Sequence, residues 1–140
     1  MIRALRFCVG FLLVLSMPMI ATTASAAPKG RVTGTATYRE RIALPPDAVF
    51  EARLENVSRT DGSAVVIAHV RKNRPGQLPI AFSISYDPRL IHQRARYLVR
   101  ATISERGRPL YKSVRDSPVL THGHGDNVTI VLRRVGGNLR

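Results

Sequence analysis

The chain repeatedly alternates apolar and polar residues with a period of two, and this pattern constrains its fold more than any other feature. Within Ala48–Ser58, the apolar residues Phe50, Ala52 and Leu54 alternate with charged residues. Side chains two residues apart lie on the same face of a β-strand. This stretch is therefore predicted to form a strand with one buried face and one solvent-exposed face.

Further strands are predicted along most of the chain, separated by turn signals at intervals of roughly 8–15 residues. Pro45-Pro46-Asp47, Asp61-Gly62 and Pro75-Gly76 are such signals. The additional predicted strands are residues 31–41, 64–72, 80–86, 96–105, 110–114 and 127–135. Residues 89–95 lack the alternation and are expected to form an irregular or helical turn. Residues 119–126 are expected to form a loop.

The run at residues 64–72 is apolar on both phases through Val70. A short helix is compatible with this pattern, but β-branched valine and isoleucine favour a strand. We therefore expect a central strand that is buried on both faces.

Together these segments give about seven or eight short strands and no convincing helix. Such a pattern is typical of an antiparallel β-sandwich or barrel, and we expect the sandwich, in which two sheets bury their apolar faces against each other. The predicted domain is single and covers residues 31–135, with short tails at residues 27–30 and 136–140.

The N-terminal segment predicts export. Arg3 and Arg6 precede the apolar run Phe7–Ile20, and Ala24-Ser25-Ala26 fits the cleavage pattern of a secretory signal peptide. The apolar run is shorter than the roughly 20 residues that span a bilayer as a helix, although a retained membrane anchor is the alternative. We expect cleavage after Ala26, which leaves a periplasmic or extracytoplasmic chain without a transmembrane helix.

Cysteine occurs once, at Cys8, inside the predicted signal peptide. A lipoprotein cysteine would follow the apolar run, whereas Cys8 lies near its basic end. The mature chain is therefore expected to contain no lipobox cysteine, no disulfide and no thiol chemistry.

The chain is strongly basic, with a formal net charge of +13. Such a charge favours an anionic partner. Because an exported chain rarely meets nucleic acid, lipopolysaccharide, phospholipid or an acidic polymer is expected instead. Arginine dominates the positive charge, and guanidinium binds phosphate and carboxylate in a bidentate way. A genome biased toward arginine codons is the alternative, which the dispersed positions of the arginines favour.

Two basic clusters are candidate contacts for an anion or a partner. Arg71, Lys72 and Arg74 surround a predicted strand end, and Arg133 and Arg134 lie on the last predicted strand. A cationic loop can grip phosphate or an acidic protein patch. Alternatively, these are solvated residues whose like charges discourage edge-to-edge aggregation.

The loop Thr121–Asp126 is the candidate for a metal site. Its His122, His124 and Asp126 are residue types that bind zinc, but Gly123 and Gly125 indicate a flexible, solvated loop. No nucleophile elbow and no glycine-rich phosphate loop occurs in the sequence. No catalytic residue and no cofactor are therefore predicted.

Four stretches carry a resemblance to the YbaY/YscW family of small bacterial envelope proteins. They are "VTGTATYRERIALPPDAVFEARLENVS", "PGQLPIAFSISYDP", "YLVRATISERGRPLY" and "VTIVLRRV", between Val32 and Val135. The resemblance implies a β-sandwich domain, usually lipid-anchored, and one branch resembles pilotins that escort secretin subunits to the outer membrane. The missing cysteine at the predicted cleavage site departs from that pattern and favours a soluble periplasmic relative.

These observations predict a non-catalytic exported β-sandwich that binds an envelope protein or polymer and is chaperone-like or pilotin-like. The partner implied is a secretin-type or other outer-membrane component. One alternative is an arginine-mediated binder of an anionic envelope surface. A second is a metal-binding or hydrolytic protein that uses the loop of His122, His124 and Asp126.

Overall fold

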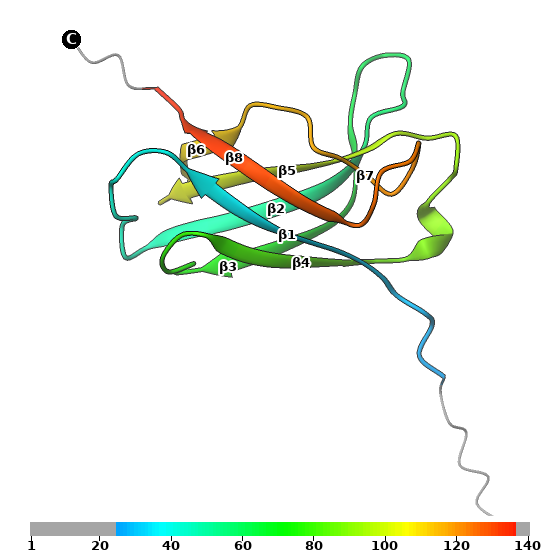
Figure 1. The fold of residues 1–140 in the computed structure, drawn as a ribbon, viewed down its shortest axis with the longest axis horizontal. Helices are drawn as coiled ribbons and strands as arrows, with labels where there is room; N and C mark the ends of the chain where they lie inside the picture. The colour runs from blue at the N-terminus through cyan, green and yellow to red at the C-terminus, as the bar shows by residue number, and fades with distance from the viewer. Residues whose placement is uncertain (1–24, 137–140) are drawn as a thin grey trace, which may run out of the picture.

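A computed structural model describes residues 25–136, in which eight strands form one continuous sheet whose two edges approach each other (Figure 1). The strands are β1 (Gly30–Tyr38), β2 (Ala48–Asn56), β3 (Val65–Asn73), β4 (Ile80–Tyr86), β5 (Tyr97–Glu105), β6 (Arg108–Ser113), β7 (Pro118–Val119) and β8 (Asn127–Arg134). A short 3-10 helix, η1 (Pro88–Leu90), follows β4.

The sheet has the strand order β3-β2-β5-β6-β8-β1-β4, and β7 adds to β5 beside this path. The two edge strands, β3 and β4, lie side by side without a hydrogen-bonded ladder between them (Figure 1). The protein is therefore an all-β single domain with a nearly closed, barrel-like sheet. The expected two-sheet sandwich is not confirmed, because the strands belong to one sheet that curls through its accumulated twist.

Strand pairing is antiparallel throughout the described sheet except between β1 and β8, which run parallel with Tyr38 opposite Leu132. The expectation of a fully antiparallel fold is wrong at this pair. Parallel neighbours need a long connection, and here β1 and β8 are the first and last strands of the domain. Their pairing joins the first and last strands of the domain next to the edge strand β4.

The core is the interior of the curled sheet, and the alternation in the sequence predicts which side chains enter it. The residues expected to face inward are buried, and Tyr86 is partly buried. They are Val32, Gly34, Ala36, Tyr38, Phe50, Ala52, Leu54, Ile80, Phe82, Ile84, Tyr97, Val99, Ala101 and Ile103. A period of two places every second side chain on the inner face, so the predicted register is confirmed for β1, β2, β4 and β5.

The segment at residues 64–72 differs from its prediction as a buried central strand. It forms β3, an edge strand that pairs only with β2, and its Val65 and Val66 remain 40% and 46% exposed. Ala68 and Val70 pack partly against the core, because they pair with the inward residues Leu54 and Ala52. The apolar run therefore reflects one packed face plus an exposed apolar end, not burial on both faces.

Lys72 occupies the seam between the two edge strands. Its register partner on β2 is Phe50, which is fully buried, so Lys72 lies on the inward phase of β3. Its ammonium donates a hydrogen bond to the backbone carbonyl of Ala81 on β4. A side chain thus bridges a gap that no backbone ladder crosses.

The remaining differences concern element boundaries. The strand expected at residues 110–114 begins earlier, as β6, and the last expected strand is β8. The turn expected at residues 89–95 contains the end of η1. The strand β7 was not expected, because two residues are too few to carry a periodic pattern; Val119 nonetheless becomes buried where it pairs with Tyr97.

Some predictions concern residues beyond the described range. The predicted signal peptide at residues 1–26, including Cys8, lies outside the described residues except for Ser25 and Ala26, as does the tail after Gly136. Within residues 25–136, no helix is long and apolar enough to cross a bilayer.

Candidate functional site

The histidine loop between β7 and β8 is closed by backbone hydrogen bonds. Leu120 N donates to the carbonyl of Gly125 at 2.9 Å, and His124 N donates to the carbonyl of Thr121 at 3.2 Å. The buried Thr121 also donates its hydroxyl to the carbonyl of Ala95 at 2.7 Å. The loop is therefore more ordered than its two glycines suggest.

The three candidate ligands of this loop do not form a metal site. His122 and His124 line a small cavity of about 130 Å³ whose nearby carboxylate belongs to Asp116. Asp126 is not part of this lining; its backbone carbonyl accepts a hydrogen bond from Thr33 N on β1 at 2.8 Å. Within residues 25–136, no three histidine, cysteine or acidic side chains gather closely enough to hold a metal ion.

The first basic cluster, at the end of β3, separates into different structural roles. Lys72 bridges the seam to Ala81, as described above. Arg74 adopts a positive φ of 51° in the turn after β3, and its backbone N donates to the carbonyl of Ala48 at 2.9 Å. Arg71 lies on the opposite phase from Lys72 and is exposed. The structure therefore does not bring these three cations together around one point.

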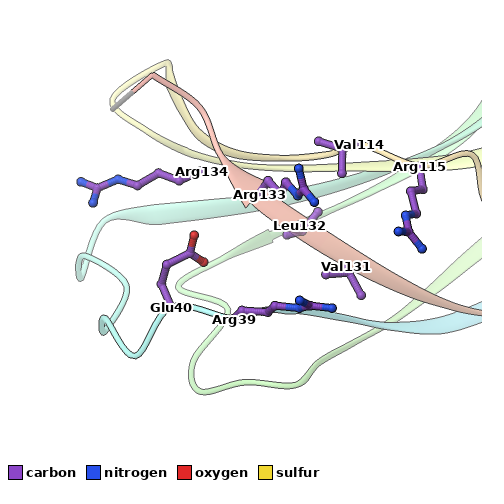
Figure 2. A pocket seen from close by; sticks show the side chains of 8 residues that line it. All are labelled: Arg39, Glu40, Val114, Arg115, Val131, Leu132, Arg133 and Arg134. Carbon is purple, nitrogen blue, oxygen red and sulfur yellow. The ribbon is translucent and has the colours of Figure 1, made fainter. Parts of the chain in front are cut away.

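The second basic cluster, Arg133 and Arg134, lies in a groove together with two arginines that are distant in the sequence, Arg39 and Arg115. We call it the arginine groove: it is lined by Arg39, Arg115, Arg133 and Arg134 and by the exposed Val114 and Val131. Figure 2 shows the Arg134 side chain directed away from the other three arginines. Glu40 and the backbone neighbour Leu132 complete its lining, and its volume is about 390 Å³. It is the largest cavity that we describe in the molecule.

The sheet topology explains how these residues meet. On β8, Val131 and Arg133 face outward because Leu132 between them is buried. β8 is paired on one side with β1, whose end leads into Arg39, and on the other with β6, whose end leads into Val114 and Arg115. The groove is thus built on a central strand that has a hydrogen-bonded neighbour on each side.

Within the described part of the chain, none of the four arginines of the groove is paired with an acidic side chain. Within residues 25–136, every ion pair of an arginine with a carboxylate involves Arg53, Arg59, Arg89, Arg100 or Arg106. The arginines of the groove take part in none of them. Their charge is therefore available to a ligand.

Glu40, the single acid of the groove lining, lies near a stacked pair of tyrosines. The rings of Tyr38 and Tyr111 are 4.3 Å apart and nearly parallel. Burial raises the pKa of Tyr111, the Glu40 carboxylate adds to this effect, and Arg134 opposes it. Burial also raises the pKa of Tyr38, with smaller contributions from Tyr111 and Glu40. Glu40 and Arg134 thus shift the pKa of Tyr111 in opposite directions.

Of the residues that the sequence proposes as anion contacts, only Arg133 and Arg134 belong to this groove. Arg39, Arg115, Val114 and Val131 were not singled out, because no local sequence motif connects them. A fold with β1 and β6 on either side of β8 is needed to bring them together. The one local signal among these residues is the exposed Val114 directly before Arg115.

The fold and groove together define a small, basic, barrel-like β-domain of a kind suited to binding. Comparison with known proteins identifies its family. The family model described as "Type III secretion system lipoprotein chaperone (YscW)" matches residues 27–132. The chain belongs to this family, which confirms the resemblance drawn from the sequence.

Two relatives refine this placement. The chain is 32% identical over 104 residues to the "Uncharacterized lipoprotein YbaY" of Escherichia coli (strain K12), a match that covers 74% of this chain and 55% of that protein. The chain thus spans about half the length of that relative. It is also similar to a solved alternative pilotin from the type II secretion system of Vibrio cholerae, with a TM-score of 0.74, 35% identity, and coverage of 79% of this chain and 100% of that one.

The family description names a lipoprotein chaperone, and the solved neighbour is a pilotin. These relatives also bear on the anchor, because both the family description and the Escherichia coli relative carry the word lipoprotein. This weighs against the expectation that the exported chain lacks a lipid attachment site.

Proposed function

We propose that this protein is a non-catalytic envelope chaperone of the pilotin type, which binds an outer-membrane secretion component such as a secretin subunit. The observation that carries this proposal is the similarity to a solved pilotin over the whole length of that chain at 35% identity. The family assignment supports the same class of function. The arginine groove supplies a surface on which a client can dock.

The proposal is tested by co-expressing the full-length chain with the secretin-type components encoded in its source genome. We expect reciprocal co-purification from envelope extracts, and a lower yield of assembled secretin in the outer membrane when the chaperone gene is deleted. Recovery of the chain only as a free monomer at every salt concentration, together with unchanged secretin assembly, would contradict the proposal.

A second candidate function is binding to an anionic envelope surface. The observation that favours it is the set of four arginines on one groove without carboxylate partners in the described part of the chain. Binding of this kind weakens steeply with salt. Sedimentation with lipopolysaccharide or anionic vesicles at low and high salt tests it, and no binding at low salt eliminates it.

For the site of action, we propose export with cleavage after Ala26 and no lipid on Cys8. N-terminal sequencing of exported material is expected to begin at Ala27, and an intact Met1 would contradict cleavage. Membrane fractionation of a Cys8→Ser variant is the matched test of the anchor. If this substitution releases a membrane-bound protein, lipid attachment at Cys8 replaces the soluble interpretation.

A further inference from the structure

We propose that the arginine groove binds an acidic polypeptide segment that carries aliphatic side chains among its carboxylates. This inference deepens the proposed chaperone function and rests on it, because it specifies the chemistry of the client segment. It concerns the groove formed by β8, the end of β1 and the segment after β6.

The first argument is charge. Four arginines line the groove, and within residues 25–136 none of them forms an ion pair with a carboxylate. Glu40 is the only acid in the lining. Guanidinium binds carboxylate through two parallel hydrogen bonds, which gives these contacts geometric specificity as well as energy. A segment rich in aspartate or glutamate satisfies this set of donors.

The second argument is the apolar surface between the charges. Val114 and Val131 are 55% and 42% exposed, and both line the groove. Removing exposed apolar surface from water favours association, whereas a fully polar ligand would leave these valines in contact with water. The ligand is therefore expected to alternate or intersperse aliphatic side chains with its acids.

The third argument distinguishes a polypeptide from a phosphate headgroup. The arginines are spread along the groove: Arg134 lies at one end with its side chain directed away, Arg115 lies at the other end, and Arg39 and Arg133 lie between them (Figure 2). A single phosphate needs several donors aimed at one point. Positive charges spread along a concave surface instead match a chain that presents several separate carboxylates.

The experiment uses the purified chain and a fluorescein-labelled peptide composed of glutamate and leucine, with anisotropy as the readout. Two matched peptides serve as ligand controls: one replaces glutamate by lysine, and the other replaces leucine by serine. We expect the acidic peptide with leucine to bind, the lysine peptide not to bind, and the serine peptide to bind about tenfold more weakly.

Protein variants locate the binding to the groove. We expect Arg133→Glu to lower the affinity by at least about tenfold. Val131→Ser is expected to lower it severalfold without changing the net charge. Arg71→Glu makes the same charge change as Arg133→Glu on β3, and we expect near-wild-type affinity. Circular dichroism and chemical denaturation establish that each variant is folded.

Four results would overturn the proposal. Equal weakening by Arg71→Glu and Arg133→Glu would mean diffuse electrostatic attraction. Unchanged affinity in Val131→Ser, together with equal binding of the serine peptide, would remove the aliphatic requirement. Tighter binding to phosphatidylglycerol vesicles than to the peptide, with loss in Arg133→Glu, would assign the groove to lipid headgroups. If the acidic peptide does not bind but the secretin still co-purifies with the chain, this inference is wrong and the proposed chaperone function is unaffected.

Discussion

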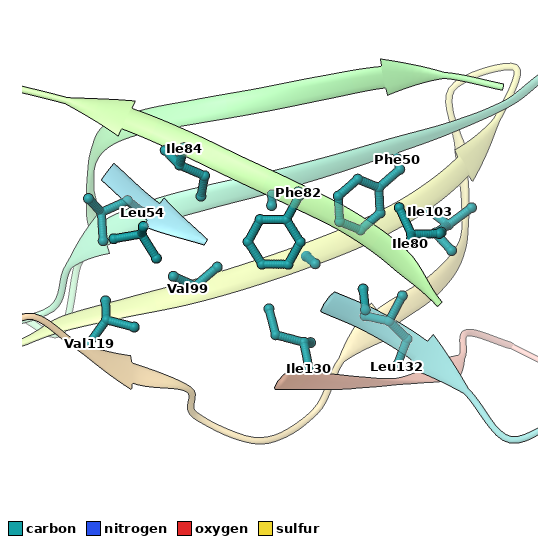
Figure 3. Close-up of a cluster of buried hydrophobic side chains, with 14 of the residues drawn as sticks. Phe50, Leu54, Ile80, Phe82, Ile84, Val99, Ile103, Val119, Ile130 and Leu132 are labelled. Carbon is teal, nitrogen blue, oxygen red and sulfur yellow. The ribbon is translucent and has the colours of Figure 1, made fainter. Parts of the chain in front are cut away.

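The ring of Phe50 on β2 lies 5.7 Å from the ring of Phe82 on β4, at an interplanar angle of 39° (Figure 3). These strands are not neighbours in the sheet, since β2 is one strand from one edge and β4 is the other edge. The contact therefore crosses the interior of the curled sheet. Side-chain packing, and not a backbone ladder, holds the two ends of the sheet together.

Phe82→Ala is expected to destabilise the domain by about 3–5 kcal/mol, because it removes a buried ring and leaves a cavity between β2 and β4. Urea denaturation followed by circular dichroism measures this loss. Ser83→Ala, at the exposed neighbouring position on the same strand, is the control and is expected to change stability by less than about 0.5 kcal/mol. Similar losses of stability in the two variants would contradict the conclusion that the Phe50–Phe82 contact stabilises the curled sheet.

Gly34→Ala is expected to cost about 1–3 kcal/mol of stability through overpacking. A Cβ atom at Gly34 would lie 2.3 Å from the backbone carbonyl oxygen of Val128 and 2.7 Å from the ring of Phe82. The carbonyl belongs to the parallel β1–β8 pair and has little freedom to move. Thermal denaturation tests this, with Gly125→Ala as the control, since a Cβ there meets nothing within 4 Å. Equal melting temperatures for wild type and Gly34→Ala would rule the clash out.

Lys72→Val is expected to promote self-association. An inward-pointing charge on an edge strand discourages pairing with another chain, and Lys72 also bridges to the carbonyl of Ala81. Sedimentation velocity over a range of concentrations measures the association. Arg71→Val removes a charge from the other phase of β3 and should remain closer to wild type. A monomeric Lys72→Val protein at all concentrations would refute the protective role.

Acid should destabilise the domain through its turn aspartates. The Arg106 side chain lowers the pKa of Asp47, and the Arg89 side chain and backbone lower the pKa of Asp87, both from 3.8. A lowered folded-state pKa contributes stability above the unfolded-state value, and this contribution is lost as pH falls through the folded-state pKa.

The melting temperature between about pH 6 and pH 2 measures this effect. We expect a smaller acid-induced drop in Asp87→Asn than in wild type. High salt should reduce the difference between the two proteins, because exposed ion pairs are screened. Identical acid profiles would show that these contacts do not contribute to the pH dependence.

Zinc titration tests the histidine loop directly. Since His122 and His124 line a small cavity with Asp116, and Asp126 is not part of that lining, we expect calorimetry to give the same weak or absent heats for wild type and the double variant His122→Ala/His124→Ala. A loss of affinity in the double variant would restore the metal-binding alternative.

The predictable part of the fold is its pattern of faces. The alternation of Phe50, Ala52 and Leu54 with charged residues reflects the two-residue period of a strand. It therefore predicts the buried face of β2 without knowledge of the strands that pair with it. The closure of the sheet depends instead on which strands become neighbours. No local pattern encodes the parallel pairing of β1 with β8, and this pairing makes the difference between a curled sheet and two layers.

The position of β3 and the composition of the groove were harder to predict for the same reason. Val65 and Val66 have the composition of a central strand, but their exposure is decided by the missing second neighbour of β3. Arg133 was identifiable from charge alone. Arg39 and Arg115 are single arginines in an arginine-rich chain, and only the tertiary fold gives them a common site.

The unpaired seam has a consequence for motion. The barrel can widen between β3 and β4 without rupturing any strand pairing, so amide protons directed at this gap should exchange with solvent sooner than those of β6 and β8. We expect this opening motion to be confined to the side of the barrel that carries Lys72. β8 is hydrogen-bonded to a neighbouring strand on each side. A client bound to β8 would therefore be little displaced when the seam opens.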